Sequence, residues 1–239
     1  MNPGFSKNNG SAISKKDGLK VCVIIPAYNE SISIAKIVKQ IKEQGLDVLV
    51  IDDGSTDNTG QIAQDNGAIV LRKQNNEGKG AALISGFHYA LNQDFDTVIT
   101  MDADGQHLSC EIPFFLERSV KLNSSFVIGN RMLKRQNMPF IRVITNKFMS
   151  WLISKIIKQE IPDSQCGFRL IKCGILRKIN LQTSNYDTES EILIRSSRLG
   201  FKIESVPIKT IYKKEKSRIN PFFDTLRFLR LIVKELFTA

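Results

Sequence analysis

Two carboxylates that stand one residue apart, Asp102 and Asp104, follow a short apolar run and have the residue types of a metal site. Alternate residues of an extended segment project to the same side, so both carboxylates can face one cation, and Gln106 adds a third oxygen. Hard oxygens suit Mg²⁺ or Mn²⁺, and an ion held here would neutralise the charge that builds on a diphosphate leaving group. For an Asp-x-Asp pair taken alone, a solvated acidic turn is the simpler explanation, because Asp favours turns. The metal-site interpretation therefore depends on residues elsewhere in the chain.

Polar residues at the ends of two other predicted strands suit the recognition of a nucleoside. Tyr28 can cover a base or a ribose. The carboxylates of Glu30, Asp52 and Asp53 can accept hydrogen bonds from base or ribose groups. Each of these residues is commonplace by itself, so only their combination indicates a nucleoside site.

Lys79 lies between two glycines just before a predicted helix at residues 81–91. The glycines allow close backbone approach, and Lys79 offers a cation for a phosphate or a base near the helix N-terminus. A Walker loop would end in Gly-Lys-Ser/Thr, and a dinucleotide fingerprint would follow the first strand, where this chain has Pro26-Ala27-Tyr28. The sequence therefore disfavours both of those nucleotide-binding folds.

Apolar strands alternate with helical patterns through the first hundred residues. Strands are predicted at residues 20–25, 48–51, 68–71 and 97–101, and helices at 31–44, 56–65 and 81–91. This alternation implies right-handed crossovers and a doubly wound, mostly parallel α/β sheet, whose ligands bind beyond the carboxyl ends of the strands. The later sequence predicts helices at 112–122, 187–199 and within 132–160, and strands at 126–128, 202–206 and 209–212.

The composition is that of one folded, soluble domain. Hydrophobic residues make up 42% of the 239 residues and charged residues 24%. No apolar run approaches the ~20 residues needed to span a bilayer, and residues 1–18 have the composition of a flexible tail without a signal-peptide core. The four cysteines show no CxxC pairing, which favours a reducing cytoplasm.

The formal charge of +10 favours a polyanionic partner. Phosphorylated ligands, an anionic membrane surface and nucleic acid all fit a positive charge. The chain has no recognisable nucleic-acid module and its basic residues are dispersed, so nucleic acid is not expected as a partner.

Six motifs, taken in order, resemble the family 2 inverting glycosyltransferases of GT-A fold, in the dolichyl- or polyprenyl-phosphate sugar synthase branch (dolichol-phosphate mannosyltransferase-like). The resemblance spans roughly residues 20–235. The motifs are Pro26-Ala27-Tyr28-Asn29-Glu30, Asp52-Asp53-Gly54-Ser55, Gly78-Lys79-Gly80, Asp102-Ala103-Asp104-Gly105-Gln106-His107, Gly129-Asn130-Arg131 and Cys166-Gly167-Phe168-Arg169.

The resemblance implies a role for residues in each motif. The nucleotide-sugar site would consist of Pro26, Tyr28, Glu30, Asp52, Asp53, Lys79, Asp102, Ala103 and Asp104, and the Mg²⁺ or Mn²⁺ site of Asp102, Asp104 and Gln106. The acceptor phosphate would meet Arg131, Arg169 and, from a mobile basic loop, Lys216 and Arg218. The catalytic set would be Asp102, Asp104, Arg131 and Glu189.

Proteins of this branch transfer a hexose or amino-hexose from a GDP- or UDP-sugar to a polyprenyl (dolichyl or undecaprenyl) phosphate, with inversion and without a covalent intermediate. Because a phosphate acceptor is already anionic, it needs positioning more than a strong base. Glu189 is therefore expected to position groups, with simple helix capping as the other interpretation. A sugar-hydroxyl acceptor would instead require Asp187, Glu189 or Glu191 as a base.

Two alternatives lie outside this activity. A sugar nucleotidyltransferase on a similar sheet is disfavoured, because its usual glycine- and lysine-rich first loop is missing. A catalytically silent nucleotide-sugar-binding subunit of a membrane complex is disfavoured by the intact pair Asp102 and Asp104.

The expected organisation is a tail at residues 1–18, a catalytic domain at 19–220 and an amphipathic helix at 221–239. That helix either packs on the sheet or lies on an anionic membrane, which would place the protein in the cytoplasm, peripherally attached to a membrane and within reach of a membrane-protein partner. Its expected apolar stripe comprises Phe222, Leu226, Leu229, Val233 and Leu236.

Overall fold

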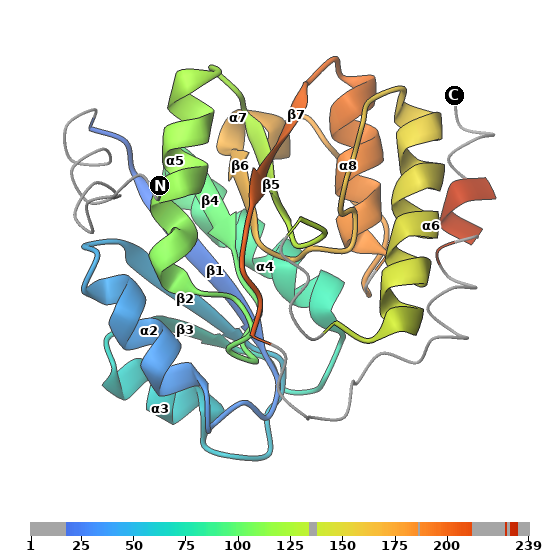
Figure 1. The fold of residues 1–239 in the computed structure, drawn as a ribbon. Helices are drawn as coiled ribbons and strands as arrows, with labels where there is room; N and C mark the ends of the chain where they lie inside the picture. The colour runs from blue at the N-terminus through green and yellow to red at the C-terminus, as the bar shows by residue number, and fades with distance from the viewer. Residues whose placement is uncertain (1–17, 134–137, 186, 212–227, 229, 234–239) are drawn as a thin grey trace, which may run out of the picture.

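The computed structural model describes residues 18–133, 138–185, 187–211, 228 and 230–233. These residues form a seven-stranded sheet with helices on both faces (Figure 1). The strands are β1 (Val21–Ala27), β2 (Asp47–Asp52), β3 (Ile69–Arg72), β4 (Thr97–Thr100), β5 (Phe126–Asn130), β6 (Arg169–Lys172) and β7 (Ile203–Pro207). The helices are α2 (Ile34–Lys42), α3 (Thr59–Asp65), α4 (Lys79–Asn92), η1 (Ser109–Glu111), α5 (Ile112–Lys121), α6 (Phe140–Ile157), α7 (Cys173–Leu176) and α8 (Thr188–Arg198).

The strand order is β3-β2-β1-β4-β6-β5-β7. All pairs are parallel except those of β6, which runs antiparallel to both β4 and β5. The prediction of a doubly wound, mostly parallel α/β sheet is therefore confirmed, and the first four strands lie close to their predicted positions. The predicted strand at 209–212 is wrong for its described part, where Thr210 forms only an isolated bridge with His107.

Each face of the sheet has its own hydrophobic core. Along β1, Val23 and Ile25 point into a core shared with α2, α3 and α5, whereas Cys22 and Ile24 point into a core shared with α4, α6 and α8. Figure 1 shows these two groups of helices on opposite sides of the sheet. Burial on both faces explains why the parallel strands are continuous apolar runs rather than alternating ones.

The described part of the C-terminal region, residues 228 and 230–233, is helical and packs on the protein. Phe228 and Ile232 are buried in the same core as Met149 and Ile153 of α6. Of the apolar stripe predicted for this helix, only Val233 belongs to the described residues, and it is exposed. Within the part of the chain that the structure describes, no helix is long and apolar enough to cross a bilayer.

Candidate active site

Loops from three neighbouring strands meet at the carboxyl edge of the sheet. Asp53, after β2, donates its backbone N–H to the carbonyl of Ala27 at the end of β1. The hydroxyl of Ser33 donates to the carbonyl of Ala103, after β4, at 2.6 Å. These bonds bring the first, second and fourth predicted loops together, as the parallel sheet requires.

The residues predicted to hold a nucleoside divide into a surface group and a buried group. Tyr28 and Glu30 are half-buried on the first loop, where the backbone N–H of Glu30 donates to the hydroxyl of Thr59 at 2.8 Å. Pro26 is buried within β1 and pairs with Ile51 of β2. Tyr28 and Glu30 therefore lie where a ligand at this edge can reach them.

Asp52 and Asp53 are buried, and their carboxylates bind protein groups. Asp52 accepts the backbone N–H of Ser55 at 2.9 Å. Asp53 accepts the backbone N–H groups of Glu77 and Gly78, at 3.1 and 2.8 Å. In this structure the two carboxylates shape the loops around the site, so their direct contact with a nucleoside stays a prediction.

The glycines beside Lys79 make room for protein backbone. A Cβ on Gly80 would lie 2.5 Å from the carbonyl carbon of Ser184 and 2.6 Å from the carbonyl oxygen of Asn185. The same Ser184 carbonyl accepts the N–H of Ala81 at 2.9 Å. Gly78 adopts φ 97°, a conformation that L side chains rarely take. The start of α4 is thus covered by a loop about 100 residues away in sequence, and the contact of Lys79 with a phosphate or a base stays a prediction.

The side chain of Lys79 points toward the carboxylates of Asp102 and Glu189. Its Nζ lies 2.5 Å from Oδ1 of Asp102 and 3.1 Å from Oε1 of Glu189. Burial alone would lower the pKa of Lys79, but the two carboxylates raise it well above its ordinary value. Gly167 leaves space for this pair, since a Cβ there would lie 2.7 Å from Asp102 and 2.9 Å from Nζ. The ammonium is therefore charged and shared between two elements of the site.

Asp102 and Asp104 fit a divalent cation. Burial and the charge of Asp102 raise the pKa of Asp104, so a positive ion between the two carboxylates would relieve their repulsion. Although burial opposes it, the Lys79 ammonium holds the pKa of Asp102 well below its usual range. Among the described residues, no three His, Cys, Asp or Glu side chains are arranged so that together they could hold a metal ion, which leaves the amide oxygen of Gln106 as the third candidate ligand.

His107 is a neutral residue that directly follows the loop of Asp102, Asp104 and Gln106. Its Nδ1 accepts the backbone N–H of Asp102 at 3.3 Å, and its ring lies 5.3 Å from that of Phe168. Burial lowers the pKa of His107 despite the nearby carboxylates. A protonated imidazole has no acceptor nitrogen, so the bond at Nδ1 agrees with the neutral form, and the 3.8 Å approach to the Asp102 carboxylate is not a salt bridge.

Arg131 lies at the end of β5 and is held by a carboxylate that the sequence did not single out. Its Nε and Nη2 donate to the two oxygens of Asp163 at 2.7 and 2.8 Å, and its backbone N–H donates to Oδ2 at 3.0 Å. Arg131 is close enough to Asp102 to help lower the pKa of that carboxyl. The signal for Asp163 in the sequence is its place in the polar turn that enters β6.

Arg169 does not face a ligand, so its predicted contact with the acceptor phosphate needs correction. It is 1% exposed, and its guanidinium donates to the carbonyls of Ser164, Cys166 and Glu189 at 2.8, 2.8 and 2.5 Å. The bonds join the turn that carries Asp163 to the helix that carries Glu189. Arg169 therefore supports the partners of both Arg131 and Lys79.

Glu189 and Glu191, in the first turn of α8, have separate partners within the protein. Glu191 is fully buried, accepts the backbone N–H groups of Gln182 and Thr183, and pairs with Nε of Arg195 at 2.7 Å. Glu189 pairs with Lys79. The positioning role of Glu189 stays a prediction, for which this pairing names Lys79 as the group that would be positioned.

Lys216 and Arg218 lie outside the described residues. The last described residue before that segment, Ile211, lies beside the loop of Asp102 and Asp104, because its backbone N–H donates to the carbonyl of Gln106 at 3.1 Å. Thr210 forms its bridge with His107 at the same place.

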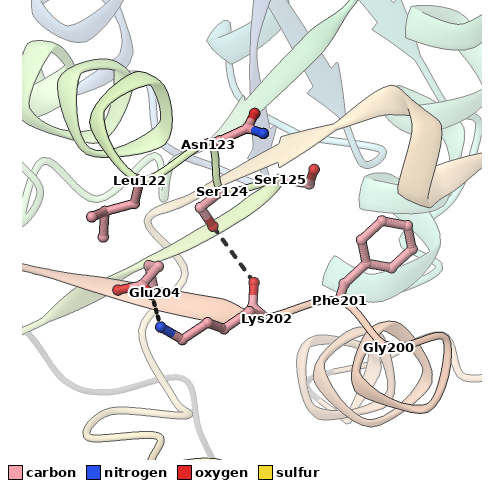
Figure 2. A pocket seen from close by; sticks show the side chains of 8 residues that line it. All are labelled: Leu122, Asn123, Ser124, Ser125, Gly200, Phe201, Lys202 and Glu204. Atoms are coloured by element: carbon pink, nitrogen blue, oxygen red, sulfur yellow. Dashed lines mark hydrogen bonds and ion pairs between the residues drawn. The ribbon is translucent and has the colours of Figure 1, made fainter.

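A separate cavity of about 220 Å³ lies at the amino ends of β5 and β7 (Figure 2). Figure 2 shows Lys202 and Glu204 paired at its rim, 2.7 Å apart, and the hydroxyl of Ser124 donating to the carbonyl of Lys202. This end of the sheet is opposite the edge that carries Asp102 and Arg131. The cavity is therefore not part of the candidate active site.

Comparisons with known proteins show the family to which this chain belongs. The model of the family described as "Glycosyl transferase family 2" matches residues 22–180. The UDP-N-acetylglucosamine–dolichyl-phosphate N-acetylglucosaminyltransferase of Methanococcus voltae is 30% identical over 215 residues, which is 80% of this chain and 86% of that protein. The undecaprenyl-phosphate mannosyltransferase of Micrococcus luteus is 32% identical over 213 residues, which is 82% of this chain and 85% of that protein.

A solved structure shows the shared fold. Glucosyl-3-phosphoglycerate synthase from Mycobacterium tuberculosis, in complex with Mn²⁺ and UDP-glucose, matches with a TM-score of 0.73 at 20% identity, covering 100% of this chain and 84% of that one. The family model covers well over half of the chain, and both relatives are at least 30% identical over most of their length. The chain therefore belongs to glycosyl transferase family 2 and is a glycosyltransferase of GT-A-like α/β fold.

Proposed function

We propose that this glycosyltransferase moves a hexose or amino-hexose from a GDP- or UDP-sugar to a polyprenyl phosphate, with inversion and with the help of Mg²⁺ or Mn²⁺. Two relatives that are 30% and 32% identical are named for transfer to dolichyl phosphate and undecaprenyl phosphate. Structures of the same fold hold Mn²⁺ with UDP-glucose, or Mg²⁺ with UDP. These names and ligands support the donor, metal and acceptor proposed here.

The observation that carries the proposal is the pairing of Glu189 and Glu191, two of the three candidate bases at the start of α8. A hydroxyl acceptor needs a base, but Glu189 is bound to the Lys79 ammonium and Glu191 is enclosed by backbone N–H groups and Arg195. In this structure, protein groups therefore already occupy both carboxylates where an acceptor hydroxyl would have to bind. A phosphate monoester is anionic at neutral pH and can attack without transferring a proton, so the site suits a phosphate acceptor.

The residues of this chain then divide the work. Asp102, Asp104 and Gln106 would hold the metal ion, which supplies positive charge to the leaving diphosphate when bound. Arg131, fixed by Asp163, would place the acceptor phosphate so that its oxygen faces the anomeric carbon on the side opposite the diphosphate. Tyr28 and Glu30 would contact the nucleoside from the first loop.

The acceptor is a lipid, and α6 presents an apolar surface to solvent. One side of this helix packs in the core through Met149 and Ile153. The opposite side exposes five large apolar residues, and the rings of two of them stack 6.2 Å apart. They are Phe140, Ile141, Ile144, Phe148 and Trp151, and the exposed fraction of Phe140 reaches 78%.

Lysines interrupt the same exposed surface. Lys147 and Lys155 are exposed on α6 at positions that place them on the side of Phe148. An apolar helix face with basic residues suits the surface of an anionic membrane. We propose that α6, rather than the C-terminal helix alone, rests on the cytoplasmic face of such a membrane.

The position of α6 relative to Arg131 supports this arrangement. The hydroxyl of Ser150 on α6 accepts the backbone N–H of Ser164 at 2.8 Å. Ser164 follows Asp163, the partner of Arg131. The buried side of α6 is therefore fixed to the turn that holds Arg131, so the helix and the guanidinium proposed to receive the lipid phosphate keep a fixed position relative to each other. Lys216 and Arg218 remain further candidates for that phosphate.

The direct test is transfer from a panel of UDP- and GDP-sugars to a short polyprenyl phosphate, in Mn²⁺ or Mg²⁺, with products identified by mass spectrometry. A sugar–phosphate–lipid product that EDTA and Asp104→Ala both abolish would support donor, acceptor and metal together. Nucleoside diphosphate release without a lipid product would replace the acceptor by a hydroxyl compound. In that case Glu189→Gln should lose turnover while keeping donor binding.

A further inference from the structure

The ammonium of Lys79 lies against Asp102, a carboxylate that would also have to bind the metal ion. It contacts Oδ1 of Asp102 at 2.5 Å and bridges to Glu189 at 3.1 Å. Its side chain is 18% exposed, and Gly167 lies against it. A cation that binds Asp102 must therefore approach a carboxylate that already has a positive partner.

The charges around this contact do not balance. Asp102, Asp104 and Glu189 supply three carboxylates to the cluster, and Lys79 supplies one cation. The positive charge of Arg131 is matched by Asp163. These described groups therefore carry about two unbalanced negative charges, which one divalent cation would neutralise. Lys79, however, repels such a cation at close range.

We propose that Lys79 is an internal cation that weakens metal binding in the free enzyme and releases Asp102 when the donor diphosphate arrives. This inference rests on the proposed metal-dependent use of a nucleotide sugar. Without nucleotide, the metal ion and the ammonium compete for Asp102. A diphosphate gives the ammonium a second anionic partner, so both cations can then be held. Metal and nucleotide therefore bind cooperatively, and Lys79 is the source of that coupling.

The test measures Mn²⁺ binding directly, by electron paramagnetic resonance of the unbound ion, without acceptor or turnover. Wild type and Lys79→Met are compared without nucleotide and with saturating UDP or GDP. Lys79→Met removes the competing charge, so Mn²⁺ should bind roughly tenfold tighter or more without nucleotide. The gain in Mn²⁺ affinity on adding nucleotide should be smaller in the variant than in wild type, and the reciprocal effect on nucleotide affinity should shrink equally.

Lys73→Met is the matched control. Lys73 pairs with Glu77 at 2.8 Å and Asp53 at 3.7 Å, so its loss removes the same charge from a neighbouring loop without touching Asp102. Its nucleotide-free Mn²⁺ affinity should stay within about twofold of wild type. Thermal unfolding checks that each variant is folded, and Lys79→Gln, which keeps a polar side chain, carries the same expectation as Lys79→Met.

Unchanged or weaker Mn²⁺ binding in both Lys79 variants would overturn this inference and leave the proposed function standing. Tighter binding in Lys73→Met as well would also overturn it, because the effect would then come from general charge. If no form of the protein binds Mn²⁺, with or without nucleotide, the inference falls together with the metal part of the proposed function.

Discussion

Replacing Asp163 by Asn should destabilise the protein strongly, although Asp163 contacts no proposed ligand. Its carboxylate is fully buried and accepts three hydrogen bonds from Arg131. The amide keeps one acceptor, loses the charge and turns N–H donors toward the guanidinium. A buried cation left without its partner costs about 3–5 kcal/mol. Since domains are stable by only about 5–15 kcal/mol, the loss is a large fraction of the total.

Urea unfolding followed by circular dichroism measures this loss. With a slope of about 2–3 kcal/mol per molar urea, the midpoint of Asp163→Asn should fall by roughly 1–2 M. Glu204→Gln is the matched control, because its two partners, Arg118 at 3.2 Å and Lys202 at 2.7 Å, are 42% and 81% exposed. An exposed pair of this kind contributes under about 1 kcal/mol.

A double-mutant cycle decides whether the pair itself is responsible. In Arg131→Met/Asp163→Asn the unpaired charge is gone, so the double variant should be more stable than the sum of the two single changes predicts, by about 2 kcal/mol or more. Its transfer activity should nevertheless stay low, since Arg131 is missing. A loss in Asp163→Asn no larger than in the Glu204 control, or additive single effects, would refute the reasoning.

Several other changes test separate parts of the molecule. Burial and the charge of Asp102 raise the pKa of Asp104. Mn²⁺ binding by wild type should therefore weaken as the pH falls through that raised pKa, because the carboxyl gains a proton and loses its charge. Titration of Mn²⁺ by electron paramagnetic resonance at decreasing pH checks this. Phe148→Asp/Trp151→Asp should reduce cosedimentation with anionic vesicles several-fold, whereas Val120→Asp, exposed on α5 on the other face of the sheet, should not. Iodoacetamide at pH 8 should label the exposed Cys110 in the native protein and the other three cysteines only after unfolding, as detected by mass spectrometry. Burial raises the pKa of Cys22 and Cys166 to about 12 and that of Cys173 to about 11, so these thiols carry little thiolate in the native protein.

The fold was largely predictable because each parallel strand is an uninterrupted apolar run that ends at a polar loop. The alternation of strand and helix up to Thr100 then left few arrangements open. The place of β6 was not predictable in this way. A four-residue strand has no pattern that says which neighbours it pairs with, and antiparallel pairing with β4 and β5 depends on contacts across some 40 to 75 residues.

The site was predictable as a set of loops but not as a set of partners. Asp102 and Asp104 follow a strand end, which is a local property of the sequence. The contacts of Lys79 depend on residues far away in the sequence: Gly78 and Gly80 make room for the loop at 184–185, and Glu189 approaches from α8. The burial of Arg169 was missed because arginine is usually a surface residue, and only its place at the start of a core strand distinguishes it.

The antiparallel strand β6 also has a consequence for how the chain is made. Strands β3, β2, β1 and β4 are complete once about 100 residues have left the ribosome, and can pair at once. β5 is synthesised next but has no place on that sheet, because β6 must enter between β4 and β5 and comes some 40 residues later. Until then β4 is an open edge and β5 an unpaired apolar segment, so a nascent chain stalled between residues 130 and 168 should be the form most prone to aggregate and most dependent on chaperones.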